Sequence, residues 1–290
     1  CVMAVSQAVH ADSLDEQRNR YAQIKQAWDN KQMDTVQALM PTLKDYPLYP
    51  YLEYRQITDD LMNQPTVTVN NFIQANPTLP PARTLKSRFV NELARREDWR
   101  GLLAFSPDKP GATEAQCNYY YAKWATGQQE EAWTGAKELW LTGKSQPNAC
   151  DPLFSAWRAS GKQDPLSYLE RIRLAMKAGN TRLVTVLAGQ MPADYQTIAS
   201  AVISLANDPN TVLTFARTTG ATDFTRQMAA VAFASVARQD AENARLMIPS
   251  LAQAQQLNED QIQELRDIVA WRLMGNDVTD EQAKWRDDAI

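Results

Sequence analysis

Residues 166–189 read LSYLERIRLAMKAGNTRLVTVLAG, and this stretch decides the fold. Apolar residues recur in it at helical intervals on both sides of Gly179. They are Leu169, Ile172 and Met176 before the glycine, and Leu183, Val186 and Leu187 after it. Such spacing places one apolar stripe along each of two helices, and the glycine marks a turn between them. The stretch therefore predicts a helix-turn-helix pair.

The same design returns elsewhere, with turns expected at Glu97–Asp98, at Gly127 and at Gln239–Asp240. Turns recur roughly every 30 residues, which is typical of stacked helix pairs such as tetratricopeptide (TPR) repeats. A single pair cannot bury its stripe alone, so each pair stacks on the next. We predict an all-α fold, an α-superhelix or solenoid that is curved or ring-forming. A compact all-α globule or an α/α toroid stays open as an alternative.

Two local patterns add detail to this expectation. Ser13 and Glu16 have the spacing of a capping box, which opens a helix. That helix is expected to bury Leu14, Tyr21, Ile24 and Trp28 on one face. Thr66–Val69 is the one stretch with the alternation of polar and apolar residues that is typical of a strand.

The two ends of the sequence indicate processing and truncation. Cys1–Ala11 is uncharged and ends in Val-His-Ala, as expected of the last part of a secretory signal peptide cleaved after Ala11. The last residues resemble the middle of a helix. We therefore expect a leader remnant at 1–11 and an α-superhelical domain at 12–290 that is cut before further domains. The alternative is a cytosolic chain with a disordered start.

Composition excludes several functions. His10 is the one histidine, so a chain cleaved after Ala11 has no imidazole for a catalytic triad, a zinc site or general base catalysis. The 30 Lys and Arg residues nearly balance 34 Asp and Glu residues, which argues against a nucleic-acid partner. No run of about 18 uncharged apolar residues occurs, so no membrane span is predicted.

Cleavage after Ala11 would leave two cysteines, Cys117 and Cys150, which lie 33 residues apart. An exported chain meets an oxidising compartment, where two thiols tend to pair. We predict a structural disulfide, with two buried unpaired thiols as the alternative.

No carboxylate pair, nucleophile elbow, phosphate-binding loop or metal-ligand cluster stands out with supporting context. We therefore predict no catalytic, cofactor or metal residue in these 290 positions. A basic cluster is the one candidate binding feature, for an anionic ligand, with solvated surface charge as the alternative. It comprises Arg83, Lys86, Arg88, Arg95, Arg96 and Arg100.

One further stretch is much more specific than a helical pattern. Residues 46–55 read YPLYPYLEYR, which resembles a segment near the start of the mature soluble lytic transglycosylases of enteric-type bacteria. The resemblance covers essentially residues 12–290. Other segments that carry it are Leu79–Arg83, Arg88–Leu93, Cys117–Trp124 and Ala221–Met228.

The resemblance implies a function for the parent protein. Members of this family are periplasmic, use no metal, and cleave the MurNAc–GlcNAc β-1,4 bond of peptidoglycan to leave 1,6-anhydromuramoyl ends. A superhelical N-terminal ring precedes a linker and a lysozyme-like catalytic domain, whose glutamate lies in a Glu-Ser motif followed by Gly-Leu-Met-Gln. Neither motif occurs here. The chain is therefore similar to the non-catalytic N-terminal portion, and Cys117 and Cys150 fall where the family's disulfide is expected.

The implied partners are glycan strands, the chain's own downstream linker and catalytic domains, and possible other cell-wall enzymes. Two alternatives belong to different classes. One is a stand-alone periplasmic TPR-like module that binds proteins or peptides. The other is a complete polysaccharide lyase or glycosidase on an α/α toroid, which the missing histidine disfavours.

Overall fold

A computed structural model describes residues 13–275 and 277–290, and every regular element within them is helical. The predicted all-α fold of successive helix-turn-helix pairs is confirmed. The leader expected at 1–11 lies outside the described residues. The chain forms two compact units, Cys1–Thr126 and Gly127–Ile290. A single superhelical domain over 12–290 stays a prediction.

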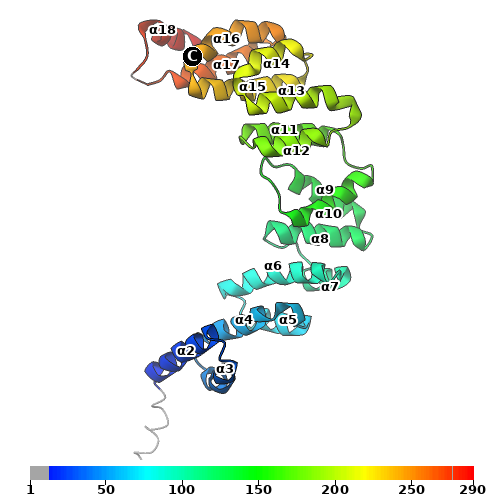
Figure 1. The fold of residues 1–290 in the computed structure, drawn as a ribbon, viewed down its shortest axis with the longest axis vertical. Helices are drawn as coiled ribbons and strands as arrows, with labels where there is room; N and C mark the ends of the chain where they lie inside the picture. Colours follow the sequence, from blue (N-terminus) through cyan, green and yellow to red (C-terminus); the bar gives the residue numbers. More distant parts are fainter. Residues whose placement is uncertain (1–12, 276) are drawn as a thin grey trace, which may run out of the picture. The chain divides into compact units, whose positions relative to one another are not determined.

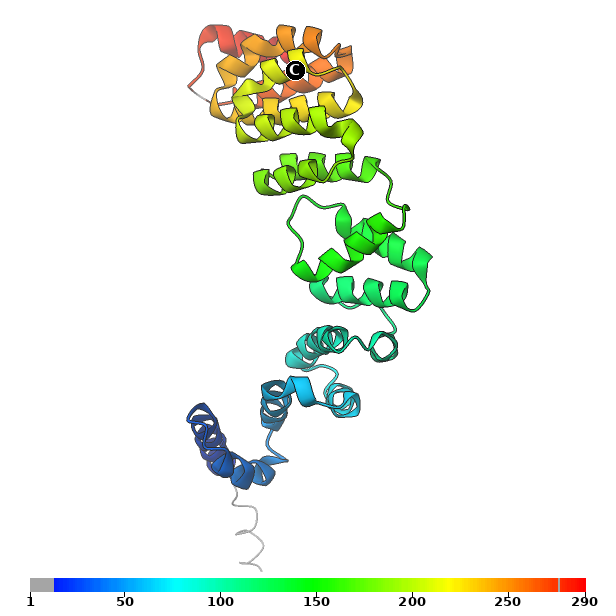
Figure 2. The same cartoon turned by 45° about the vertical axis from the view of Figure 1, so that its right-hand side comes forward.

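The helices of each unit follow one another closely in sequence (Figures 1 and 2). The first unit contains α2 (Leu14–Asp29), α3 (Met33–Leu39), η1 (Met40–Leu43), α4 (Tyr49–Asp59), η2 (Leu61–Asn63), α5 (Thr66–Ala75), α6 (Pro80–Arg95), α7 (Trp99–Phe105) and α8 (Thr113–Ala125). The second contains α9 (Gln129–Trp140), η3 (Asn148–Cys150), α10 (Asp151–Ala159), α11 (Leu166–Lys177), α12 (Thr181–Gly189), η4 (Ala193–Tyr195), α13 (Gln196–Asn207), η5 (Pro209–Thr211), α14 (Val212–Thr218), α15 (Asp223–Gln239), α16 (Ala241–Ala254), α17 (Glu259–Arg272) and α18 (Asp280–Ala289).

The expected turns are found where the sequence places them. Gly179 adopts a φ of 71° between α11 and α12, and Glu97 adopts a φ of 56° between α6 and α7. Both values lie in the left-handed region that ends a helix and that glycine adopts at little cost. Asp98 and Asp240 then cap the helices that follow, since each carboxylate accepts a hydrogen bond from a backbone N–H three residues on.

The first helix begins as predicted and buries the predicted face except at its first residue, with Tyr21 partly buried against the same cluster. Ser13 accepts a hydrogen bond from the Glu16 N–H at 3.3 Å, which is the N-cap half of the expected capping box. Ile24 and Trp28 are buried, as expected. The burial predicted for Leu14 is wrong, because this side chain is 59% exposed in the first turn of the helix.

The strand-like alternation at Thr66–Val69 is also overruled. These residues form the first turn of α5, which Pro65 precedes as the N-cap residue. Val69 and Phe72, three positions apart, are both buried against α6 and its neighbours. A helical apolar pair thus decides the conformation, since strand propensity depends on packing context.

A buried polar side chain joins three helices of the second unit. Gln255 ends α16 and is fully buried. Its Nε2 donates to the Ala216 carbonyl oxygen of α14 at 2.9 Å, and its Oε1 accepts from the Thr225 hydroxyl of α15 at 2.8 Å. Both ends of the amide are therefore satisfied, which is what allows a buried amide to stabilise a core.

The cysteines behave as predicted. Cys117 and Cys150 are fully buried and both are disulfide-bonded, so the expected disulfide is present. None of the helices in the described ranges has the length and apolar character needed to cross a bilayer.

Candidate functional site

The predicted basic cluster lies on α6, on the residue that ends it, and on α7. Its six members are Arg83, Lys86, Arg88, Arg95, Arg96 and Arg100. Two of them share one acidic partner, Glu92, which is only 8% exposed. Arg95 Nη2 lies 2.6 Å and Arg96 Nε 3.2 Å from Glu92 Oε1. Arg95 and Arg96 thus have a structural role in the first unit.

The remaining four basic residues divide into two kinds. Arg88 donates to the Tyr54 hydroxyl at 3.2 Å, and the Lys86 ammonium lies 5.4 Å from the centre of the Phe105 ring. Arg83 and Arg100 are exposed and have no hydrogen-bond or ion-pair partner among residues 13–275 and 277–290. A glycan-facing role for the cluster stays a prediction. Arg83 and Arg100 are the members whose guanidinium groups are available to bind a ligand.

Glu92 gives the first unit a pH-dependent stability. Hydrogen bonds from Arg95 lower the pKa of Glu92, more than its partial burial raises it, and Arg96 adds to the effect. A lowered native-state pKa stabilises the fold at neutral pH, and this contribution is lost as the pH falls through the native value. We expect Glu92→Gln to reduce the free energy of unfolding at pH 7 by about 1–3 kcal/mol.

The variant should also lose less stability than the wild type as the pH falls from about 5 to about 3. Urea unfolding across that range checks this result. Glu114→Gln is the matched control, since Glu114 is exposed in the first turn of α8. Equal acid sensitivity of wild type and Glu92→Gln would contradict the assignment.

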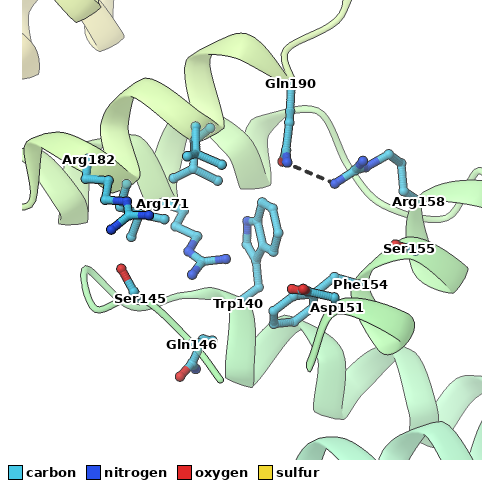
Figure 3. Close-up of a pocket in the computed structure, with 13 residues that line it drawn as sticks. Trp140, Ser145, Gln146, Asp151, Phe154, Ser155, Arg158, Arg171, Arg182 and Gln190 are labelled. Carbon is cyan, nitrogen blue, oxygen red and sulfur yellow. Dashed lines mark hydrogen bonds between the residues drawn. The ribbon is translucent and has the colours of Figure 1, made fainter. Parts of the chain in front are cut away.

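The second unit contains a pocket that the sequence did not reveal (Figure 3). It has a volume of about 440 Å³, within the range of about 300–1,000 Å³ that is usual for ligand pockets. Its walls are formed by α10, α11 and α12, by the end of α9 and by the loop after α9. Its lining comprises Trp140, Ser145, Gln146, Asp151, Phe154, Ser155, Arg158, Arg171, Arg182, Leu183, Val186, Leu187 and Gln190.

Arg171 is the unusual member of this pocket. It is only 4% exposed, and burial lowers the pKa of its guanidinium to about 10. The guanidinium carbon lies 4.5 Å from the centre of the Trp140 ring and 5.6 Å from that of Phe154. Arg171 Nη2 donates to the Lys144 carbonyl oxygen at 3.3 Å. Its buried Nε has no acceptor in the part of the chain that the structure describes.

The sequence does contain a signal for a buried charge on α11. Tyr168, Ile172 and Ala175 form the buried stripe of α11, and Arg171 lies within that stripe three residues after Tyr168. A charged residue at such a position is rarely buried without a partner. The predicted stripe of Leu169, Ile172 and Met176 is offset from this buried face, since Leu169 and Met176 are only partly buried, and it does not include Arg171.

The rest of the described chain contains few groups suited to metal binding or acid catalysis. No three His, Cys, Asp or Glu side chains gather there in a way that would hold a metal ion. Burial raises the pKa of the half-buried Glu53 carboxyl in α4, which is the direction a general acid needs. A raised pKa on one carboxyl does not by itself make a catalytic site.

The succession of helix-turn-helix pairs defines the chain as an α-helical repeat protein. No protein-family model matches it. Over all 290 residues it is 90% identical to the soluble lytic murein transglycosylase of Escherichia coli K12, and it spans 45% of that protein's length. The resemblance read from the sequence is confirmed.

Solved structures agree with this match. The crystal structure of the 70 kDa soluble lytic transglycosylase from Escherichia coli has a TM-score of 0.91 and 92% identity, covering 96% of this chain and 45% of that one. An inactive mutant of the lytic transglycosylase Slt from Pseudomonas aeruginosa has a TM-score of 0.76 and 27% identity, covering 93% of this chain and 46% of that one. The chain thus spans less than half of each relative.

Proposed function

We propose that this chain is the N-terminal, non-catalytic scaffold of a periplasmic soluble lytic transglycosylase. The whole enzyme cleaves the MurNAc–GlcNAc β-1,4 bond of peptidoglycan and leaves 1,6-anhydromuropeptides. This portion guides glycan strands or restricts their access to a catalytic domain, so it acts by positioning rather than by proton transfer. The observation that carries the proposal is the 90% identity over the entire chain.

The local chemistry supports a scaffold. Among the described carboxyl groups, Glu53 has a raised pKa through burial, whereas the buried Glu92 has a lowered pKa and is paired with arginines. Glycoside cleavage by an acid needs a carboxyl group aimed at a bound sugar. Arg83 and Arg100 are free to attract the lactyl carboxylates that MurNAc carries wherever its stem peptide has been removed, and such surface charges act by steering more than by tight binding.

The experiment incubates the 290-residue chain with purified peptidoglycan sacculi and analyses the products by mass spectrometry. We expect no anhydromuropeptides above a no-enzyme control, and the same result for Glu53→Gln. Release of anhydro products by the chain, lost in Glu53→Gln, would place catalysis in this portion and overturn the non-catalytic assignment.

A second arm tests the guiding role by a pull-down of the chain on immobilised glycan strands that are stripped of peptide. We expect the wild type to be retained on the strands and the double variant Arg83→Gln/Arg100→Gln to be retained several-fold less at low salt. Arg217→Gln/Arg238→Gln is the matched control, since both arginines are exposed in the second unit. Absence of wild-type binding would refute the guiding role and leave the non-catalytic assignment standing.

A further inference from the structure

The pocket around Arg171 has a cationic side. Arg171 and Arg182 lie on one side of the opening beside Ser145, and Arg158 lies across from them, where it donates to Gln190 Oε1 at 3.2 Å (Figure 3). Asp151 is the one acidic residue in the lining. Three arginines against one aspartate give the pocket a net positive charge, which favours an anionic occupant.

Arg171 has unused binding capacity. A guanidinium carries five N–H donors in a planar fork that matches a carboxylate or phosphate bidentately. Lys144 supplies the one hydrogen-bond acceptor that Arg171 has within the described residues, at a long 3.3 Å. Asp151 raises the Arg171 pKa through space, yet it forms no ion pair with it. A buried cation without a close counter-ion is costly, and a bound anion would offset that cost.

Part of the pocket lining is apolar. Leu183, Val186 and Leu187 of α12 form it together with Phe154 of α10. Val186 is 49% exposed, although its helical spacing predicts a core position. A lining that combines cationic and apolar side chains suits a ligand that joins an acid group to a short hydrocarbon or peptide group.

We propose that this pocket binds the carboxylate of a small organic acid, with Arg171 and Arg182 holding the acid group and α12 covering its apolar part. A carboxylate with an apolar substituent is favoured over phosphate, because phosphate has no apolar part to contact Phe154 and the α12 side chains of the lining. This inference does not depend on the proposed function. The competing interpretation gives Arg171 a purely structural role, stacked between Trp140 and Phe154.

Trp140 supplies a local readout. Its indole Nε1 donates to the Ser167 carbonyl oxygen at 2.9 Å, and the Arg171 guanidinium lies over its ring. An anion that binds to the Arg171 guanidinium therefore changes the environment of the Trp140 ring. The experiment titrates the ¹⁵N-labelled 290-residue chain with N-acetylalanine and follows the Trp140 indole N–H signal, assigned by its absence in Trp140→Phe. N-acetylalaninamide is the neutral control, and inorganic phosphate is the second anion.

We expect a saturable shift of the Trp140 signal with N-acetylalanine and no shift with its amide. Phosphate should bind at least several-fold more weakly. Arg182→Gln should weaken binding about three- to tenfold, since it removes one charge from an exposed position without touching the core. Arg171→Gln should weaken it about tenfold or more. Arg217→Gln, an exposed arginine outside the lining, should leave it unchanged.

Three outcomes would overturn the proposal. One is the absence of any Trp140 shift with N-acetylalanine, which leaves Arg171 a structural residue. Another is an equal shift with the acid and its amide, or equal or tighter binding of phosphate, which refutes a carboxylate site. The third is equal weakening by Arg182→Gln and Arg217→Gln, which would mean diffuse attraction to surface charge. Because Arg182 is exposed, its variant keeps the test decisive even if Arg171→Gln fails to fold.

Discussion

Phe89→Ala should reduce the free energy of unfolding of the first unit by about 3–5 kcal/mol, the usual cost of removing a buried aromatic ring. Phe89 has no exposed surface in α6. Its ring packs edge-on against Phe105 of α7 with centroids 5.1 Å apart. The Arg96 guanidinium carbon lies 5.2 Å from the centre of the Phe89 ring. Alanine would therefore leave a cavity where α6 and α7 meet.

Urea unfolding measures this loss, and amide hydrogen exchange at residues 80–125 locates it. Met62→Ala is the control in the same unit, because Met62 is 61% exposed and surface changes alter stability by about 0.5 kcal/mol or less. A loss below about 1 kcal/mol for Phe89→Ala would show that α6 and α7 collapse around the vacated space.

Trp140→Ala should destabilise the second unit by about 3–5 kcal/mol. Trp140 is 2% exposed, and its ring lies edge-on to those of Phe154, Trp157 and Tyr168 at centroid distances of 5.1, 6.2 and 5.0 Å. The variant removes these contacts, the support of the Arg171 guanidinium and the donor to the Ser167 carbonyl oxygen. Three helices, α9, α10 and α11, lose their common contact.

Trp271→Ala is a control with the same residue type, since Trp271 in α17 is 73% exposed. Thermal and urea unfolding, monitored by near-ultraviolet circular dichroism, should show a large loss for Trp140→Ala and almost none for Trp271→Ala. Similar losses for the two tryptophans would contradict the burial assigned to Trp140.

The helices were predictable because their signals are local. Gly179 and the apolar residues around it lie within one stretch of chain, and helical periodicity reports on that stretch alone. The predictions were wrong where burial or conformation depends on contacts with residues distant in the sequence. Leu14 has helical spacing but no element within residues 13–275 and 277–290 buries it, and Thr66–Val69 alternates like a strand but packs as a helix on α6.

The candidate sites likewise combine features that are local in the sequence with contacts that only the folded chain makes. A run of arginines is visible in the sequence, but its meaning depends on Glu92, which holds Arg95 and Arg96 and leaves Arg83 and Arg100 free. The pocket at Arg171 could not be predicted from α11 alone. Trp140 precedes Arg171 by 31 residues, and Arg182 belongs to the next helix. Only folding brings these three side chains to one cavity.

Gln255 constrains how this protein could be redesigned. An apolar core position such as Met247 accepts other side chains of similar volume, because dispersion contacts have no direction. The Gln255 amide instead requires the Ala216 carbonyl and the Thr225 hydroxyl at fixed positions, so it permits one axial offset between α14, α15 and α16. A chimaera that takes α16 from this chain must therefore take α14 and α15 with it, as one transferable block.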